Sequence, residues 1–139
     1  MPTLPRSVNY PHGARHEGAV SSKAGIGYAS GDGGAVTQLT NRTTGVTLNT
    51  LSGAITTHTA SLAAEATADF VVTNSKVAIG DTVCVSQRSG SNGGGTLVDV
   101  AAVAAGSFTV RVHNGNVAAG TAETGALILN FAVIKAPGS

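Results

Sequence analysis

The chain has 139 residues, of which 42% are hydrophobic and only 11% are charged, and its formal net charge at pH 7 is +1. This length is sufficient for one domain with its own core. The near-zero net charge excludes the strong electrostatic field that attracts nucleic acid or an anionic membrane, so we expect neither as a direct partner. The charged fraction is below the roughly 25% of ordinary soluble domains, which indicates a surface covered by a partner or by other copies of the chain.

Residues 1–34 differ in composition from the rest of the chain. They contain recurring proline and glycine and follow no helical or strand period, so they cannot form a core alone. Large side chains are nevertheless spaced along the segment at Leu4, Val8, Tyr10, Ile26 and Tyr28. This spacing favours an extended arm that orders against a partner over the alternative, a disordered tail. The N-terminus lacks the apolar segment of a signal peptide, which predicts synthesis in a reducing cytosol.

From residue 35 to residue 139 the pattern is that of a β domain. We expect eight strands, at residues 36–39, 46–48, 54–59, 67–73, 81–87, 96–103, 107–113 and 126–135. Residues 60–66 favour a helix but are too few to form a stable one, and we predict a loop or crossing there. Residues 88–95 are rich in glycine and serine and are expected to form an exposed hairpin loop.

The last expected strand is the most apolar run of the chain. Its alternation places Leu127, Leu129, Phe131 and Val133 on one face, and Ile128, Ala132 and Ile134 on the other. A strand that is apolar on both sides is covered on both sides. We therefore expect one face to fill the core and the second face to be covered by the arm or by another subunit.

The single cysteine, Cys84, excludes an internal disulfide framework and a zinc site made of cysteines alone. Its neighbours Val83 and Val85 indicate a strand position, where cysteine usually acts as a small buried hydrophobic residue.

Short connections between eight strands leave no room for crossover helices, which excludes a parallel α/β fold. The pattern predicts an antiparallel sandwich or barrel. An eight-stranded jelly roll built of two Greek keys is one such fold, although the pattern alone does not separate it from other sandwiches.

The sequence contains no recognisable catalytic constellation. The acidic residues are scattered, no serine occupies a Gly-x-Ser-x-Gly turn, and the histidines lie in separate segments without ligand spacing. The glycines at 93–95 are followed by a strand pattern rather than by the Lys-Ser/Thr pair and helix of a phosphate-binding loop. We therefore predict that the protein is not an enzyme, has no catalytic, cofactor-binding or metal-binding residues, and needs no cofactor.

Several runs nevertheless resemble a known family. They are residues 34–38, 44–49, 51–53, 55–56, 62–64, 70–74 and 130–135, which read GAVTQ, TGVTLN, LSG, IT, LAA, FVVTN and NFAVIK. Together they are similar to the cementing, or decoration, proteins of Bordetella-type tailed-phage capsids, over roughly residues 25–135.

That resemblance implies a jelly roll bound to the outside of a shell made of an HK97-type major capsid protein. It also implies that jelly rolls pair with one another across the symmetry axes of the shell, as a dimer or alternatively a trimer. The protein would be made in the cytoplasm of the bacterial host and would end on the outer capsid surface of the virion.

We therefore predict a structural virion protein that clamps neighbouring capsid subunits against the pressure of packaged DNA. The candidate partner-binding residues are Leu4, Tyr10, Tyr28, Ile128 and Ile134. The alternative is a receptor-binding module of a tail fibre, with residues 89–95 as its contact region. An aromatic content of 4% is low for a module that stacks against sugars, which weighs against this alternative.

Overall fold

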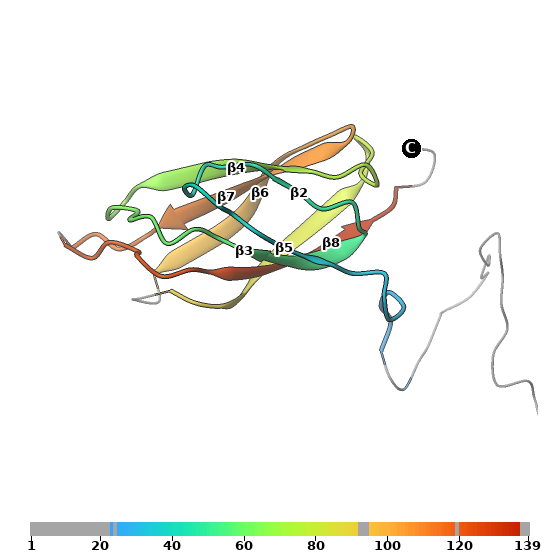
Figure 1. The fold of residues 1–139 in the computed structure, drawn as a ribbon, viewed down its shortest axis with the longest axis horizontal. Coiled ribbons are helices and arrows are strands. Elements are labelled where there is room, and N and C mark those ends of the chain that lie inside the picture. Colours follow the sequence, from blue (N-terminus) through green and yellow to red (C-terminus); the bar gives the residue numbers. More distant parts are fainter. Residues whose placement is uncertain (1–22, 24, 92–94, 119, 137–139) are drawn as a thin grey trace, which may run out of the picture.

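The computed structural model describes residue 23 and residues 25–91, 95–118 and 120–136. The described chain is a sandwich of two four-stranded sheets, with strand orders β1-β3-β8-β5 and β2-β4-β7-β6 (Figure 1). The strands are β1 (Ala35–Thr37), β2 (Val46–Thr47), β3 (Ser52–Thr56), β4 (Thr67–Thr73), β5 (Thr82–Ser89), β6 (Thr96–Ala104), β7 (Ser107–Asn114) and β8 (Ile128–Ile134).

The core lies between the two sheets and is built from alternate residues of the central strands. In β8, Leu129, Phe131 and Val133 are buried, whereas Ile134 is exposed. The side chains of neighbouring strand residues point to opposite faces of a sheet, so the period of two in the sequence becomes one buried row per strand. The corresponding inward residues of β4 and β7 are Ala68, Phe70, Val72, Phe108, Val110 and Val112.

Two aromatic rings join the sheets at the centre of this core. The ring centroids of Phe108, on β7, and Phe131, on β8, are 5.3 Å apart, and the rings are tilted by 52° to each other. This distance and tilt are within the range that aromatic pairs favour. The prediction that one face of the last strand fills the core is therefore confirmed.

The all-β prediction is confirmed, but the prediction of purely antiparallel sheets is wrong. The short edge strand β1 pairs with β3 in parallel, and β2 pairs with β4 in parallel. A parallel pair needs a long crossover connection, and here the crossover from β1 to β3 passes through β2 in the opposite sheet. Hydrophobic alternation identifies strands but carries no information on their direction.

The prediction that the glycine-rich residues 88–95 form a hairpin loop is also wrong. This connection joins β5 to β6, and these two strands belong to different sheets, so the connection is not a hairpin loop. The connection at residues 60–66, in contrast, is a loop as predicted. It is fastened by one bridge between Leu62 and Glu123, in which each backbone N–H donates to the other residue's carbonyl.

The expected burial of Cys84 is also wrong. The residue is exposed, because its position in β5 alternates with the inward-facing Val83 and Val85. The two valines correctly indicate a strand. Because neighbouring strand residues face opposite sides of a sheet, the cysteine between two inward-facing valines faces outward.

Candidate functional site

The outer face of the β1-β3-β8-β5 sheet consists of uncharged residues. The register aligns Ala132 with Ser52 on one side and with Cys84 on the other, and it aligns Asn130 with Ala54 and Ser86. We call this surface the neutral face. Its members are Ala35, Thr37, Ser52, Ala54, Thr56, Thr82, Cys84, Ser86, Ser89, Ile128, Asn130, Ala132 and Ile134. Arg88 falls beside it, at the irregularity in register between Gln87 and Ser89.

The outer face of the other sheet carries charge. Arg111, on β7, lies across from Asp69 on β4 and Asp99 on β6. The guanidinium of Arg111 contacts the Asp69 carboxylate at 2.7 Å, and this hydrogen bond lowers the pKa of Asp69. The two outer faces of one small sandwich therefore differ in polarity, and only one of them has the ion pairs of an ordinary solvated surface.

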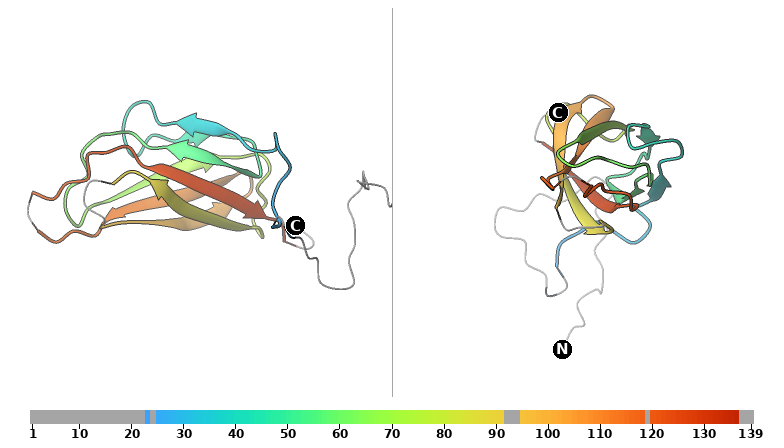
Figure 2. Two further views of the ribbon diagram at one scale, coloured as in Figure 1. Left: turned by 90° about the horizontal axis from the view of Figure 1, so that it is seen from below. Right: turned by 90° about the vertical axis from the view of Figure 1, so that its left-hand side faces the viewer.

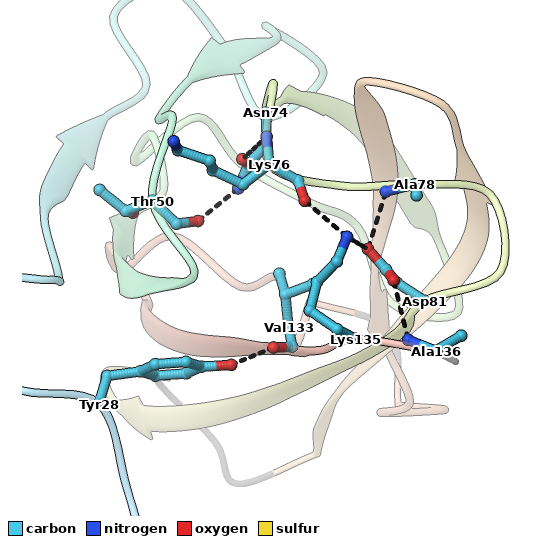
Figure 3. Close-up of polar contacts among 9 residues, drawn as sticks. All are labelled: Tyr28, Thr50, Asn74, Lys76, Ala78, Asp81, Val133, Lys135 and Ala136. Carbon is cyan, nitrogen blue, oxygen red and sulfur yellow. Dashed lines mark hydrogen bonds and ion pairs between the residues drawn. The ribbon is translucent and has the colours of Figure 1, made fainter. Parts of the chain in front are cut away.

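The chain enters the sandwich across one end of the neutral face, and Tyr28 fixes it there. At this end Val133 donates its backbone N–H to Leu51, just before β3 begins at Ser52. The hydroxyl of Tyr28 donates to the carbonyl of Val133 (Figure 3). A buried backbone carbonyl without a strand partner is costly, and the tyrosine supplies the donor that a longer β3 would have given.

An apolar pocket of about 480 Å³ lies where this entering segment meets β8. Ile26, Gly27 and Tyr28 line it from the segment, and Ala132 and Ile134 line it from the strand. Ile26 is 76% exposed and Ile134 is 58% exposed. Large apolar side chains that remain this exposed around a hollow are typical of a surface that receives a partner's side chain.

The structure brings together two of the five candidate partner-binding residues. Tyr28 and Ile134 line the same pocket, whereas Ile128 lies partly buried at the opposite end of β8. Leu4 and Tyr10 lie outside the described residues. Three lining residues, Ile26, Gly27 and Ala132, were not among the candidates, although Ala132 belongs to the same alternating row as Ile134.

Asp81 fastens the end of β8 at this same end of the sandwich (Figure 3). Its carboxylate accepts hydrogen bonds from the backbone N–H of Ala78, at 2.8 Å, and of Ala136, at 3.1 Å. It also pairs with Lys135, whose ammonium group donates to the carbonyl of Lys76. The Ala78 hydrogen bond, followed by that of Lys135, lowers the pKa of Asp81 to about 2. The carboxylate is therefore ionised at neutral pH.

The other end of the sandwich is held by a buried arginine. Arg42 is 4% exposed and lies in the turn between β1 and β2. Its guanidinium donates to the carbonyls of Gly125, at 2.8 Å, of Glu123, at 3.1 Å, and of Ala60. One side chain therefore joins three connections, and burial of its charge lowers the pKa of Arg42.

Two further buried side chains complete this polar cluster. Gln38 donates to the carbonyl of Thr44 and accepts from the backbone N–H of His58. Glu123 accepts from the hydroxyl of Thr96 and from the backbone N–H of Gly125. These contacts stabilise loops of the fold, and we assign the cluster a structural role rather than a binding one.

Within the described part of the chain, no group of three or more histidine, cysteine, aspartate or glutamate side chains is arranged to hold a metal ion. In this described part of the chain there is also no helix with the length and apolar character of a membrane span. The neutral face and its apolar pocket thus form the candidate functional site, and their chemistry suits the binding of another surface.

Comparison with protein-family models, with curated proteins and with solved structures finds no match to this chain.

Proposed function

We propose that this protein is a structural component of a tailed-phage virion that cements the outside of the capsid. It binds neighbouring subunits of an HK97-type major capsid protein and holds them together against the pressure of packaged DNA. Copies of the protein pair with one another on the shell. The proposal combines the resemblance of residues 25–135 with the character of the surface.

The observation that supports this role most strongly is the neutral face. A solvated sheet face normally carries charged side chains, as the opposite sheet does with Asp69 and Arg111. A face of small uncharged residues, with an apolar pocket at one end, loses little solvation energy when another protein covers it. Such a face suits flat apposition to a large surface better than capture of a small molecule.

We infer further that the sandwich is a reduced jelly roll. Two antiparallel pairs, β3–β8 and β4–β7, are nested in the sequence, because β4 and β7 both lie between β3 and β8. This nesting is expected when one long antiparallel hairpin folds over into two sheets, as in a jelly roll. The strands β5 and β6 complete the two sheets. The parallel strands β1 and β2 are then additions at the edges, outside this nested set.

A cementing role also agrees with a modest interaction surface on each copy. A protein that binds one repeating shell many times needs only weak individual contacts when neighbouring contacts are linked. The sequence of residues 1–34 predicts an extended arm. Such an arm would let each copy contact partners beyond its own sandwich.

The experiment uses purified shells that lack this protein. On addition of the intact chain, we expect saturable binding at many copies per particle and release of DNA at a higher temperature than from bare particles. Immunogold labelling should place the protein over the whole capsid surface. Labelling confined to the tail tip would contradict the proposal and favour the receptor-binding alternative.

A further inference from the structure

We propose that the neutral face is the surface that binds the capsid shell, and that its apolar pocket receives one large apolar side chain of the shell protein. This inference rests on the proposed function and names the contact surface that the function requires. It leaves the charged outer face of the β2-β4-β7-β6 sheet exposed to solvent.

The size of the neutral face favours a shell over a second copy of this chain as its occupant. The strands of this sheet have three, five, seven and eight residues, so at about 3.3 Å per residue and about 4.8 Å between strands they present roughly 360 Å². Two such faces would bury about 720 Å², which is less than the roughly 1,200–2,000 Å² of a stable pair of proteins. A contact of this size becomes strong when it is one of many linked contacts on a lattice.

Charge determines the chemistry that the occupant must have. The members of the neutral face offer hydroxyl, amide and methyl groups, so an approaching surface that carried lysine or glutamate would lose solvation without gaining an ion pair. The matching occupant is a flat and uncharged patch. The opposite face, with Asp69, Asp99 and Arg111, would reject such a patch for the same reason.

The pocket adds a specific anchor to this flat contact. Its volume of about 480 Å³ is sufficient for one aromatic or branched aliphatic side chain. Its walls come from β8 and from the entering segment, which Tyr28 fixes to Val133. A pocket that is already formed needs little ordering when the side chain enters, and buried anchors of this kind dominate binding energies.

Cys84 provides a direct probe of the inference, because it is the only cysteine of the chain and lies on the neutral face beside Ala132. A thiol-reactive maleimide should label it fully in the free protein. On saturated shells we expect labelling at least about tenfold slower, as for a residue at a covered interface. The matched control is Val71→Cys in a Cys84→Ser background, which places the thiol on the opposite outer face, where Val71 is 47% exposed. Its labelling rate should not change.

The possible outcomes separate the inference from the proposed function. If the protein binds shells but Cys84 stays reactive, or the thiol at position 71 becomes protected, the neutral face is not the contact surface and cementing still stands. If the protein does not bind shells, the proposed function itself fails. Protection of Cys84 in the free protein that increases with its concentration would assign the face to a second copy, and would overturn our choice of occupant.

Substitutions give an independent test. Ala132→Glu places a charge beside the pocket and should weaken shell binding by about tenfold or more. The control Thr109→Glu places the same charge on the opposite face, next to Val71, and should bind as the unchanged protein does. Thermal unfolding of both variants checks that each is folded. Equal binding of the two folded variants would contradict the inference.

Discussion

The hydroxyl of Tyr28 donates to the carbonyl of Val133, two residues that are 105 positions apart in the chain. The contact occurs at the end of the sandwich where β8 finishes beside the entering chain (Figure 2). It satisfies a backbone group of the central strand of one sheet, and it also sets the position of Ile26 and Gly27 on the wall of the apolar pocket. One hydrogen bond therefore links the folding of the domain to the shape of its candidate site.

Replacement of Tyr28 by phenylalanine should release this entering segment. The aromatic ring remains, but the Val133 carbonyl loses its donor, and we expect a loss of about 0.5–1.5 kcal/mol in the free energy of unfolding. Hydrogen exchange should become faster for residues 25–34 and remain unchanged for β4 and β7. Exchange in residues 25–34 that is the same in both proteins would show that Tyr28 does not hold the segment.

The Asp81 carboxylate should give the fold an acid-sensitive component. Its pKa in the folded protein is about 2, below the ordinary value of 3.8, so its contribution to stability is fully present above pH 3.8 and is lost as the pH falls toward 2. In Asp81→Asn, we expect lower stability at neutral pH and a flatter decline of stability between pH 4 and pH 2. Urea unfolding at several pH values measures both effects.

Asp69→Asn is the matched control for this experiment. The pKa of Asp69 is also lowered, chiefly by its hydrogen bond with Arg111, but this ion pair is exposed to solvent. Exposed pairs are screened by water and salt and contribute little. A larger loss of stability in Asp69→Asn than in Asp81→Asn would contradict the assignment of Asp81 as the fastening residue.

Arg42→Met should be one of the most destabilising single substitutions in the chain. It removes the donors to the carbonyls of Ala60, Glu123 and Gly125, and it also removes the favourable charge interaction between Arg42 and the buried Glu123. Each buried carbonyl that loses its donor costs about 1–3 kcal/mol. Thermal or urea unfolding measures the loss, and Arg111→Met, at an exposed position, should change stability far less.

A double variant tests whether the Glu123 charge accounts for part of that loss. The double variant Arg42→Met with Glu123→Gln removes both members of this charge interaction, so it should be more stable than the sum of the two single losses predicts. Simple additivity of the two losses would show that the backbone hydrogen bonds of Arg42 carry its whole effect.

Two glycines allow backbone strain to be separated from crowding. Gly90 and Gly106 both have positive φ, of 89° and 78°. A methyl group at Gly90 would lie 2.8 Å from the Cα of Leu127, whereas at Gly106 it would meet no atom within 4 Å. Gly106→Ala should cost about 1–2 kcal/mol from the conformation alone. Gly90→Ala should cost about 1–3 kcal/mol more, because the backbone just before β8 must move. Similar losses would show that the chain near residue 90 relaxes freely.

The central strands could be predicted from the sequence because their signal is local. In β7 and β8, alternate apolar residues such as Phe108 and Phe131 define the buried row directly. Strand direction could not be predicted in this way, because it depends on the path of the connections. The sequence therefore predicted neither the two parallel strand pairs nor the passage of the chain from one sheet to the other between β5 and β6.

The candidate site was predictable only in part for the same reason. Alternation pointed to the second face of β8, and spaced large side chains pointed to Tyr28, but the pocket exists because the two segments meet. The polar residues that fasten the ends were not predictable. Arg42 and Asp81 occur in patterns typical of turns or strand ends, while their partners lie up to 83 positions away in the chain.

The brevity of β1 and β2 also affects how the protein behaves at high concentration. These strands have three and two residues and form one open edge of each sheet, while the opposite edges, β5 and β6, lie against each other. An exposed edge promotes aggregation when it is long enough to pair with the same edge of another molecule. Edges of two or three residues offer too few backbone groups for such pairing. These two edges of the described sandwich therefore give little opportunity for edge-to-edge pairing between molecules.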